Sequence, residues 1–582
     1  MDEKKSPSLD LPGFNLPLDF RPTRDWNQPV FGNGLDGQDR EDGYVGYLYT
    51  IKELAMMQIM ETITDKPNWQ EKIFNDAITA KWREEIQDEE TVTEAMMDYM
   101  LDELQWKTTA FKNTGILRSY DPGVVKSDTA IERDLQKQLQ DLVKPLEEEP
   151  KDYHPGSGNK VVDLVHPSLF PLVYGQSRIL TDKLTTTDNC FLSIGQGELT
   201  KVPEAPPVNY RHQHNHYSNQ FQWLPCDVKF NNNGECQIAS YINNLHPAKH
   251  RNLYHVLEKI LTRTIPLWNE TLHGGGYRFQ HRIEYTHIEW LPTEEPEPKQ
   301  ESEDDEDEFW ERHEAWREKR LPKHPDPPIF EPPVETARSI HEVNLQKDFA
   351  EKGLQVIVKL ANIELTPEQP HYDGGSWHIE GQLNERICAT AIYYYDSQNI
   401  TDNTLSFRHR SDERHFDDVE YEQGEFEFLD VFGFDADAGR YDSEQITQSL
   451  GSVTCREGRL LTFPNTLQHR VSPFSLTDPS KPGHRKILAF FLIDPMRRII
   501  SSANVPPQRE DWCEEWRGAM RETIGKRLPV ELQCMVQDDK GFEPMTMDRA
   551  KELRLKLMEE RGANASDANE AFEHGTFNLC EH

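Results

Sequence analysis

Hydrophobic positions follow two different periods along the chain. In the first quarter, apolar residues recur at helical spacing, beginning where Thr50 and Glu53 match a capping box. A second amphipathic stretch runs over 135–146. The pattern predicts a helical region over 46–150, preceded by an extended arm over 1–45 that is rich in Pro, Gly and Asp.

After residue 150 the helical period gives way to short apolar runs broken by Pro and Gly. Within 221–243, FQWLPCDVKF and CQIASYINN flank the turn signal NNNG, which predicts a β-hairpin because Asn and Gly tolerate positive φ. Residues 252–265 return to helical spacing. We expect the mixed region 151–292 to pack on the core or to contribute strands to it. The acidic, Pro-rich stretch 293–335 is predicted to be a solvated insert or linker.

Residues 336–510 carry the clearest strand signals of the chain. The runs LQVIVKLANIEL, ICATAIYYYD, TLSFR, GRLLTF and RKILAFFLID are separated by turn residues and have no helices between them. That pattern favours an antiparallel barrel or sandwich over a parallel α/β sheet. Residues 511–582 read as helical again, with a helix over 547–561 that we expect Gly562 to stop.

Composition narrows the class of protein. The formal charge is −38, from 102 acidic and 64 basic residues, which argues against nucleic acid or an anionic membrane surface as a partner. A basic protein partner stays open. The 8 cysteines are scattered without a CxxC pair, no apolar leader opens the chain, and no run reaches the length of a membrane span. These features predict a soluble cytoplasmic protein, with the nucleus left open.

Candidate chemistry lies inside the strand-rich region, in Trp377-His378-Ile379-Glu380. Residues i and i+2 of a strand point to one face, so His378 and Glu380 converge, and His469 follows in FPNTLQHRVSPF. Two imidazoles and one carboxylate can hold one face of an octahedral Fe(II), whereas zinc prefers a closed tetrahedral site. The alternative is an ordinary cross-strand polar pair, because an HxE motif alone is weak evidence.

Arg485 opens the apolar strand that follows His469. Its rigid guanidinium can meet a carboxylate with two parallel hydrogen bonds, as the distal carboxylate of 2-oxoglutarate requires. Alternation along the strand puts Arg485, Ile487, Ala489 and Phe491 on one face. The alternative for Arg485 is a salt bridge at the end of a barrel.

A rival metal cluster is His212, His214 and His216, which would share one face of a strand and could bind Zn or Cu. No carboxylate lies in register with these histidines. Their Asn, Gln and Tyr neighbours are typical of a polar surface segment, so this cluster is the weaker candidate.

Taken together, HxE, YYY, LSFR, EGRLLTFPNTLQHRVSPF and RKILAFF resemble the core of the Fe(II)/2-oxoglutarate-dependent dioxygenases, in particular the prolyl-hydroxylase-like branch. The match covers 377–494. YINNLHP, LFPLVYG and IPLWN are similar to a mostly fungal family known only as a domain of unknown function. One departure is Glu380, where the superfamily more often has Asp; its extra methylene shifts the carboxylate and leaves the oxidative outcome open.

The resemblance implies an α+β protein with a double-stranded β-helix (jelly-roll or cupin-like) core decorated by N- and C-terminal helices. It also implies Fe(II) as the metal, 2-oxoglutarate as co-substrate, and roles for particular residues. These are His378, Glu380 and His469 as catalytic iron ligands, Arg485 as the 2-oxoglutarate anchor, and Tyr393, Tyr395 and Thr462 as pocket liners.

The function expected from these observations is oxidation of a small molecule or amino-acid derivative. Two alternatives stay open. One is a protein hydroxylase of the same class, which the acidic composition favours through a basic protein substrate. The other is a non-enzymatic scaffold on a degenerate oxygenase fold, which the presence of all three ligands and the arginine opposes.

Overall fold

The structure is a computed structural model of the 582-residue chain. It describes residues 9–23, 28–36, 46–87, 92–207, 215–273, 281–293, 295–300, 306–317, 319–333, 342–411, 416, 419–421, 425–435, 446–514, 518 and 543–573.

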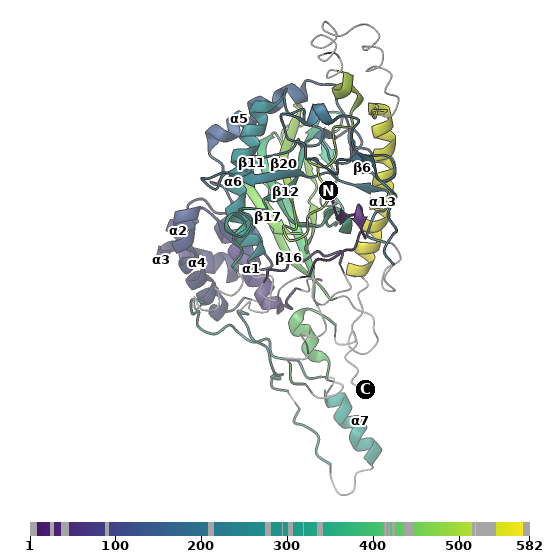
Figure 1. The fold of residues 1–582 in the computed structure, drawn as a ribbon. Helices are drawn as coiled ribbons and strands as arrows, with labels where there is room; N and C mark the ends of the chain where they lie inside the picture. The colour runs from purple at the N-terminus through teal and green to yellow at the C-terminus, as the bar shows by residue number, and fades with distance from the viewer. Residues whose placement is uncertain are drawn as a thin grey trace, which may run out of the picture.

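A large antiparallel sheet forms the centre of the molecule (Figure 1). Its strand order is β11-β10-β12-β20-β14-β17-β4-β3, and β5 pairs with β12 beside this path. The strands are β3 (Leu117–Tyr120), β4 (Val124–Ser127), β5 (Val161–Val165), β10 (Cys226–Phe230), β11 (Cys236–Ile238), β12 (Leu354–Leu365), β14 (Ile387–Gln398), β17 (Leu460–Pro464) and β20 (Gly483–Ile493). Sequence segments far apart therefore build one sheet.

A smaller sheet, in the order β16-β15-β18, packs against one face of the large sheet. Its strands are β15 (Thr404–Arg410), β16 (Thr447–Thr454) and β18 (Gln468–Val471). Apolar side chains from both sheets share one core cluster, in which the rings of Phe407 and Phe463 lie 5.1 Å apart. We call the face of the large sheet that meets this cluster the inner face.

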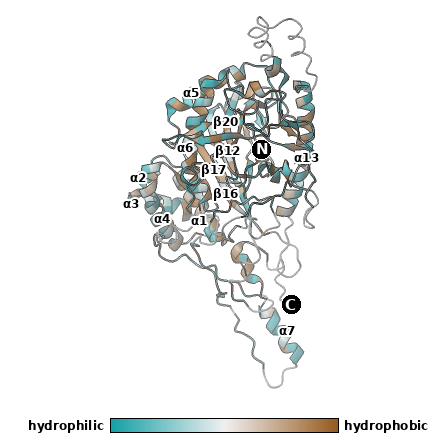
Figure 2. Cartoon of the chain, viewed as in Figure 1, coloured by the Kyte–Doolittle hydropathy of each residue, from teal (hydrophilic) through white to brown (hydrophobic). Residues whose placement is uncertain are grey.

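Helices cover the other face of the large sheet. α5 (Arg133–Glu147) and α6 (Arg251–Leu272) pack there through a second apolar cluster that includes Leu139 and Trp268. The hydropathy colouring of Figure 2 shows apolar residues along the central strands and a mixture of apolar and polar residues along these helices. The burial pattern is the one expected of amphipathic helices on a sheet.

Four N-terminal helices form a separate cluster with its own apolar interior. They are α1 (Ile51–Thr64), α2 (Trp69–Lys72), α3 (Asp76–Gln87) and α4 (Glu94–Thr114). The long C-terminal helix α13 (Met547–Glu573) runs along the opposite side of the molecule (Figure 1).

Short elements complete the fold. They are the strand pairs β1 (Leu11–Pro12) with β2 (Asn15–Leu16), β6 (Leu172–Val173) with β9 (Phe221–Gln222), β7 (Arg178–Ile179) with β8 (Glu198–Leu199) and β13 (His371–Tyr372) with β19 (Phe474–Ser475), the helix α9 (Leu345–Asp348), and 3-10 turns at Cys190–Ser193, Leu383–Glu385 and Glu427–Phe432.

Several predicted elements are confirmed. Thr50 and Glu53 form the capping box that opens α1. The hairpin predicted around NNNG is the β10–β11 pair. Each of the five apolar runs predicted as strands contains a strand, namely β12, β14, β15, β17 and β20.

Two expectations were wrong. Residues 46–150 are not wholly helical, because β3 and β4 form a hairpin that joins the large sheet beside β17. Helix α13 continues through Gly562 to Glu573. Its last turns pack Ala568 and Phe572 against Ile379, and that apolar contact outweighs the cost of a glycine inside a helix, about 1 kcal/mol.

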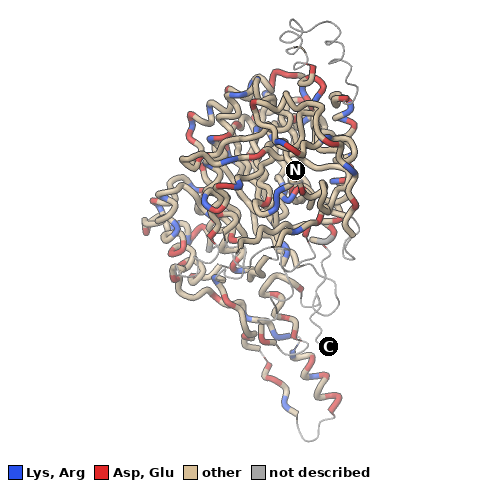
Figure 3. The backbone as a smooth tube through the Cα atoms, in the orientation of Figure 1, with Lys and Arg blue, Asp and Glu red and all other residues tan. Residues whose placement is uncertain are grey.

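The acidic insert projects from the body of the molecule as an arm that carries α7 (Glu306–Arg317), with charges of both signs along it (Figures 1 and 3). The part of the arm that follows α7 returns to the body of the molecule. Lys52 forms an ion pair with Asp326 at 2.7 Å, and the ring of Phe330 lies 5.2 Å from that of Tyr99. The end of the insert after α7 thus contacts the N-terminal helices.

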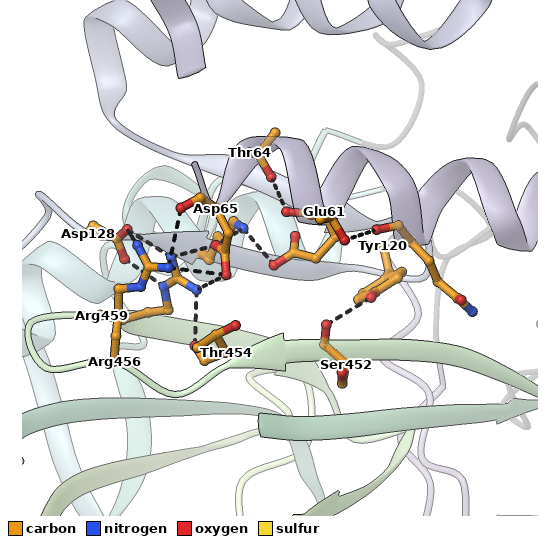
Figure 4. A network of polar contacts seen from close by, with 12 residues as sticks. Glu61, Thr64, Asp65, Tyr120, Asp128, Ser452, Thr454, Arg456 and Arg459 are labelled. Atoms are coloured by element: carbon orange, nitrogen blue, oxygen red, sulfur yellow. Dashed lines mark hydrogen bonds and ion pairs between the residues drawn. The ribbon is translucent and has the colours of Figure 1, made fainter. Parts of the chain in front are cut away.

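A buried network of charges joins α1 to the large sheet (Figure 4). Lys126 of β4 binds Glu61 and Asp65 of α1 at 2.6 and 2.7 Å. Arg459, at the start of β17, binds Asp65 and Asp128 at 2.8 and 2.6 Å. No helix within the described residues has the length and apolar character needed to cross a membrane.

Candidate metal centre

Three potential metal ligands meet where the segment 376–380 pairs with β18. The backbones of His378 and His469 exchange two hydrogen bonds, of 3.2 and 3.1 Å, as an isolated antiparallel bridge. The side chain of Asn465 holds the next residue pair in place. It accepts from the Glu380 amide at 3.0 Å and donates to the Glu380 carbonyl at 2.9 Å. The backbone bridge to His469 thus fixes His378, and the Asn465 side chain fixes the backbone of Glu380.

The side chains of these residues converge on one point. Nε2 of His378 lies 3.7 Å and Nε2 of His469 lies 3.5 Å from Oε1 of Glu380. These separations exceed an ordinary N–H···O hydrogen bond of about 2.9 Å. Two ligands at neighbouring octahedral positions, each bonded at about 2.1 Å, are roughly 3 Å apart, so a small closure would suit a cation.

The tautomer of His378 also suits a ligand. Its Nδ1 lies 2.8 Å from the Ser376 carbonyl, which accepts a hydrogen bond and therefore requires the proton on Nδ1. The lone pair is then left on Nε2, the atom that faces Glu380. A second hydrogen bond of this kind is what orients metal-binding histidines in proteins.

The charges at the centre are also suited to a cation. Burial opposes ionisation of Glu380, but the neighbouring His378 and His469 hold the pKa of this carboxyl well below its usual range. Burial and the neighbouring His378 lower the pKa of His469 to about 4, so its imidazole is neutral. Although burial disfavours its charged form, Glu380 raises the pKa of His378.

Arg485 lies on the inner face, as the predicted alternation of β20 requires. Ala489 and Phe491 share the inner cluster, and Leu488 and Phe490 lie in the cluster beneath the helices. The Arg485 side chain is 2% exposed.

The guanidinium of Arg485 donates to Asn403 Oδ1 at 2.7 Å and stacks on Tyr394 and Phe474, 5.6 and 5.1 Å from their ring centroids. Within the part of the chain that the structure describes, it has no acidic partner, and its Nε has no hydrogen-bond acceptor. It is a buried cation with donors to spare.

A second group of ligand type consists of His154, Asp163 and His166. Here the details disfavour a metal. Asp163 already binds His154 at 2.9 Å and lies 3.5 Å from Arg554. Nδ1 of His166 accepts from the Ser168 amide at 3.2 Å, which puts the proton on Nε2 and removes both lone pairs from use. Of the two groups, His378, Glu380 and His469 are therefore the better candidate for a metal site.

The remaining predicted site residues do not join this centre. Tyr393 and Tyr395 point to the helix-covered face, and Tyr395 lies in the same cluster as residues of α5 and α6. The Thr462 hydroxyl bonds Thr271 of α6 at 2.7 Å. Their expected role as pocket liners is wrong, because the strand register puts Thr462 and Tyr393 on the helix-covered face. The tyrosine of β14 that faces inward is Tyr394.

Of the rival histidine cluster, the structure describes His216. His212 and His214 lie outside the described residues. His216 is buried beside Asp567 of α13, with Nε2 3.2 Å from Oδ2. His216 therefore faces α13, a neighbour that the sequence pattern did not predict.

Three residues that shape the centre were missed. Asn465 holds Glu380, Asn403 binds Arg485, and Ser376 sets the His378 tautomer. Asn465 and Ser376 act through contacts with residues whose positions a linear pattern does not reveal, although FPNT preceding the HRV step was a visible signal.

The structure defines an α+β protein of antiparallel sheets with a His–Glu–His centre at the edge of the smaller sheet. Comparison then gives its family. Residues 94–516 match the family described as "Protein of unknown function (DUF4246)", and residues 11–85 match its N-terminal domain. The chain belongs to this family. No curated protein matches it.

Two solved structures are weakly similar. A bsmA homologue from Methylobium petroleophilum PM1 is 9% identical, with a TM-score of 0.23 over 66% of this chain and 91% of that chain. The vicilin from Solanum melongena is 14% identical, with a TM-score of 0.11 over 40% and 53%. Neither likeness is close enough to carry an argument about fold or function.

Proposed function

We propose that this protein is a non-haem Fe(II) and 2-oxoglutarate-dependent oxygenase with a double-stranded β-helix core. The strand order supports the core assignment. β12, β20, β14 and β17 are neighbours in one sheet and face β16, β15 and β18 in the other. Two facing antiparallel sheets that enclose one apolar interior are the arrangement of a jelly roll.

The observation that carries the proposal is the convergence of His378, Glu380 and His469, with His378 held in the tautomer that frees Nε2. Two neutral imidazoles and one carboxylate on one side of an ion are the ligand set of non-haem iron oxygenases, and the opposite side stays open. Bound iron with 2-oxoglutarate would supply the oxidising chemistry, which belongs to the cofactor. The residues present fit that group.

The chain itself would supply binding, orientation and exclusion of water. Arg485 would hold the distal carboxylate of 2-oxoglutarate, because its free donors face the interior and no acidic partner lies beside it among the described residues. Asn403 and the Tyr394 ring orient the guanidinium. Phe407 and Phe463 line the interior between the two sheets and lower its polarity, which strengthens charge-assisted bonds there.

We propose a small molecule or amino-acid derivative as substrate. The chain surrounds the two-sheet core with helices on several sides, and α13 covers the segment that carries His378 and Glu380. The His469 and Glu380 side chains are 3% and 16% exposed, and that of His378 is 35% exposed, so the centre opens on the His378 side. The surrounding helices favour a small substrate over a folded protein surface.

Equilibrium metal binding tests the proposal, with the second histidine cluster as a matched control. Purified wild type and His166→Ala should each bind one Fe(II), or Co(II) as a substitute, under anaerobic conditions. His469→Ala and Glu380→Ala should lose this binding, because two ligands cannot hold the ion as three do. The proposal fails if wild type binds neither metal, or if His166→Ala loses the metal and His469→Ala keeps it.

A further inference from the structure

A single lysine lies on the inner face of β12. Lys359 pairs with Ala489 of β20, and the flanking inner positions pair Ile357 with Phe491. Those neighbours belong to the apolar cluster between the two sheets. Lys359 is partly buried, so its long side chain runs along this apolar face.

This ammonium has no ion pair or hydrogen bond to any of the residues that the structure describes. The neighbouring lysine on the outer face of β20 differs in this respect, since Lys486 binds both Glu147 and Asp396 at 3.0 and 3.1 Å. Charged groups in protein interiors are generally paired, because removal from water is costly. An unpaired lysine on an inner face therefore has its charge available for a ligand.

Lys359 lies within electrostatic reach of the metal centre. Its charge acts on the pKa of His378, where it adds to the effect of burial and opposes Glu380. The same charge contributes to the lowered pKa of Asp163, against the effect of burial. Burial lowers the pKa of His166, and Lys359 adds to that shift.

Lys359 and Arg485 lie on separate stretches of the inner face. Arg485 pairs with Ile363, four positions beyond Lys359 on β12. At about 3.3 Å per residue, four positions span roughly 13 Å of backbone. A five-carbon dicarboxylate that also reaches the metal needs only one of these cations, which leaves Lys359 for a second ligand.

We propose that Lys359 binds a carboxylate of the substrate, so that this protein acts on a small organic acid. The inference rests on the proposed function and specifies its substrate class. A lone ammonium suits a carboxylate, which carries one charge, better than a phosphate, which proteins usually hold with several donors. Asp163 on the neighbouring strand would add repulsion toward a more highly charged anion.

Paired ligands test this assignment without knowledge of the natural substrate. The probes are the common L-amino acids and simple monocarboxylic acids, each with its methyl ester, which keeps the shape and removes the negative charge. Binding is measured by ligand-observed NMR on the full chain loaded with 2-oxoglutarate and Zn(II), a redox-inert substitute for iron. At least one acid should bind wild type about ten- to a hundredfold more tightly than its ester, as expected for one charge-assisted contact of about 1.5–3 kcal/mol.

Three variants sharpen the result. Lys359→Met should abolish the preference for acid over ester, and Lys359→Arg should keep part of it. Lys81→Met is the matched control, because Lys81 is exposed on α3 and its loss changes net charge by the same amount. The inference is overturned if no acid binds better than its ester, if Lys359→Met keeps the preference, or if Lys81→Met removes it.

The same samples separate this inference from the proposed function. Metal content and 2-oxoglutarate affinity should be unchanged in Lys359→Met. If that variant instead loses 2-oxoglutarate, Lys359 anchors the co-substrate and the inference is wrong. If wild type fails to bind metal yet still prefers acids through Lys359, the iron-dependent function is wrong and the acid site stands.

Discussion

Two buried arginines in neighbouring parts of the same sheet have opposite surroundings. Arg459 is 1% exposed and binds the carboxylates of Asp65 and Asp128, with Nη1 also donating to the Thr454 carbonyl at 3.0 Å. Arg485 is 2% exposed and has one neutral acceptor, Asn403, and no acidic partner among the described residues. Side chains of the same type at the same depth therefore have different electrostatic partners.

The difference separates a structural charge from one available for function. Although burial acts against it, the carboxylates around Arg459 raise its pKa, and this group joins α1 to β17 (Figure 4). A buried cation without a counter-ion costs stability, so a fold that keeps one in its interior has another use for it. That reasoning supports an anionic ligand at Arg485.

Removal of the paired arginine should have the largest effect. Arg459→Met removes the cation nearest to Asp128 and one of those bound to Asp65, which keeps Lys126. Breaking a buried ion pair typically costs 3–5 kcal/mol of unfolding free energy. Because the Asp128 side chain is 44% exposed, we expect the lower end, about 3 kcal/mol. Urea denaturation measures the loss. Affinity of the folded variant for 2-oxoglutarate should stay at the wild-type value, and a drop in affinity without a drop in stability would reverse the comparison.

Removal of the unpaired arginine should act on binding instead. Arg485→Met should weaken 2-oxoglutarate about a hundredfold, or about 2.7 kcal/mol, because a two-point contact with a carboxylate is lost. Unfolding free energy should change little or rise, since the variant no longer buries a charge without an acidic partner. Arg485→Lys should recover only part of the affinity. Calorimetric titration measures the 2-oxoglutarate affinities of wild type and the two variants. Equal affinities in all three proteins would remove Arg485 from the proposed site.

Alternation along β20 was enough to place Arg485 on the face of Ile487, Ala489 and Phe491, although the opposite face also begins with a charge, Lys486. The convergence of the candidate ligands His378 and Glu380 was predictable for a similar reason, because side chains at positions i and i+2 point to one face whenever the backbone is extended. The run Tyr393-Tyr394-Tyr395 offered no such contrast. All three are buried, so only the packing of α5 and α6 decides which face is inner.

Other features depend on contacts between distant segments. The β3–β4 hairpin is stable because its edge pairs with β17, more than 330 positions away, and its own sequence gives little strand signal. Lys359 was visible as a single charge within the apolar run LQVIVKLANIEL, but its meaning required the register with β20. Asn465 is a similar case, since its side chain hydrogen-bonds to the backbone of Glu380, 85 positions earlier in the chain.

Acid should distinguish the same two arginines. Burial acts in the other direction, but Lys126 and Arg459 hold the pKa of Asp65 below its usual value. A carboxyl whose pKa is lower in the folded state contributes stability above its unfolded pKa near 4, and that contribution is lost as pH falls below it. Between pH 6 and pH 3, wild type should therefore lose more unfolding free energy than Arg459→Met. Arg485→Met should follow the wild-type slope, and a flattened slope would point to an acidic partner for Arg485.

An exposed arginine should show the smallest effect. Arg251 pairs with Asp188 at 2.6 Å, but the two side chains are 63% and 72% exposed. Exposed pairs of this kind contribute about 0–1 kcal/mol, so Arg251→Met should change unfolding free energy by less than about 0.5 kcal/mol and leave ligand binding unchanged. A loss comparable to that of Arg459→Met would mean that burial does not explain the difference between the arginines.

Anaerobic titration with Fe(II) and then 2-oxoglutarate, followed by visible absorption, tests the proposed iron site most directly. Wild type should develop a weak visible band that saturates with 2-oxoglutarate, because the co-substrate then binds iron held by His378, Glu380 and His469. Arg485→Met should reach the same band only at about a hundredfold higher 2-oxoglutarate concentration. His469→Ala should give no band. A wild type without a band at millimolar 2-oxoglutarate, or a His469→Ala protein that matches wild type, would contradict the assignment.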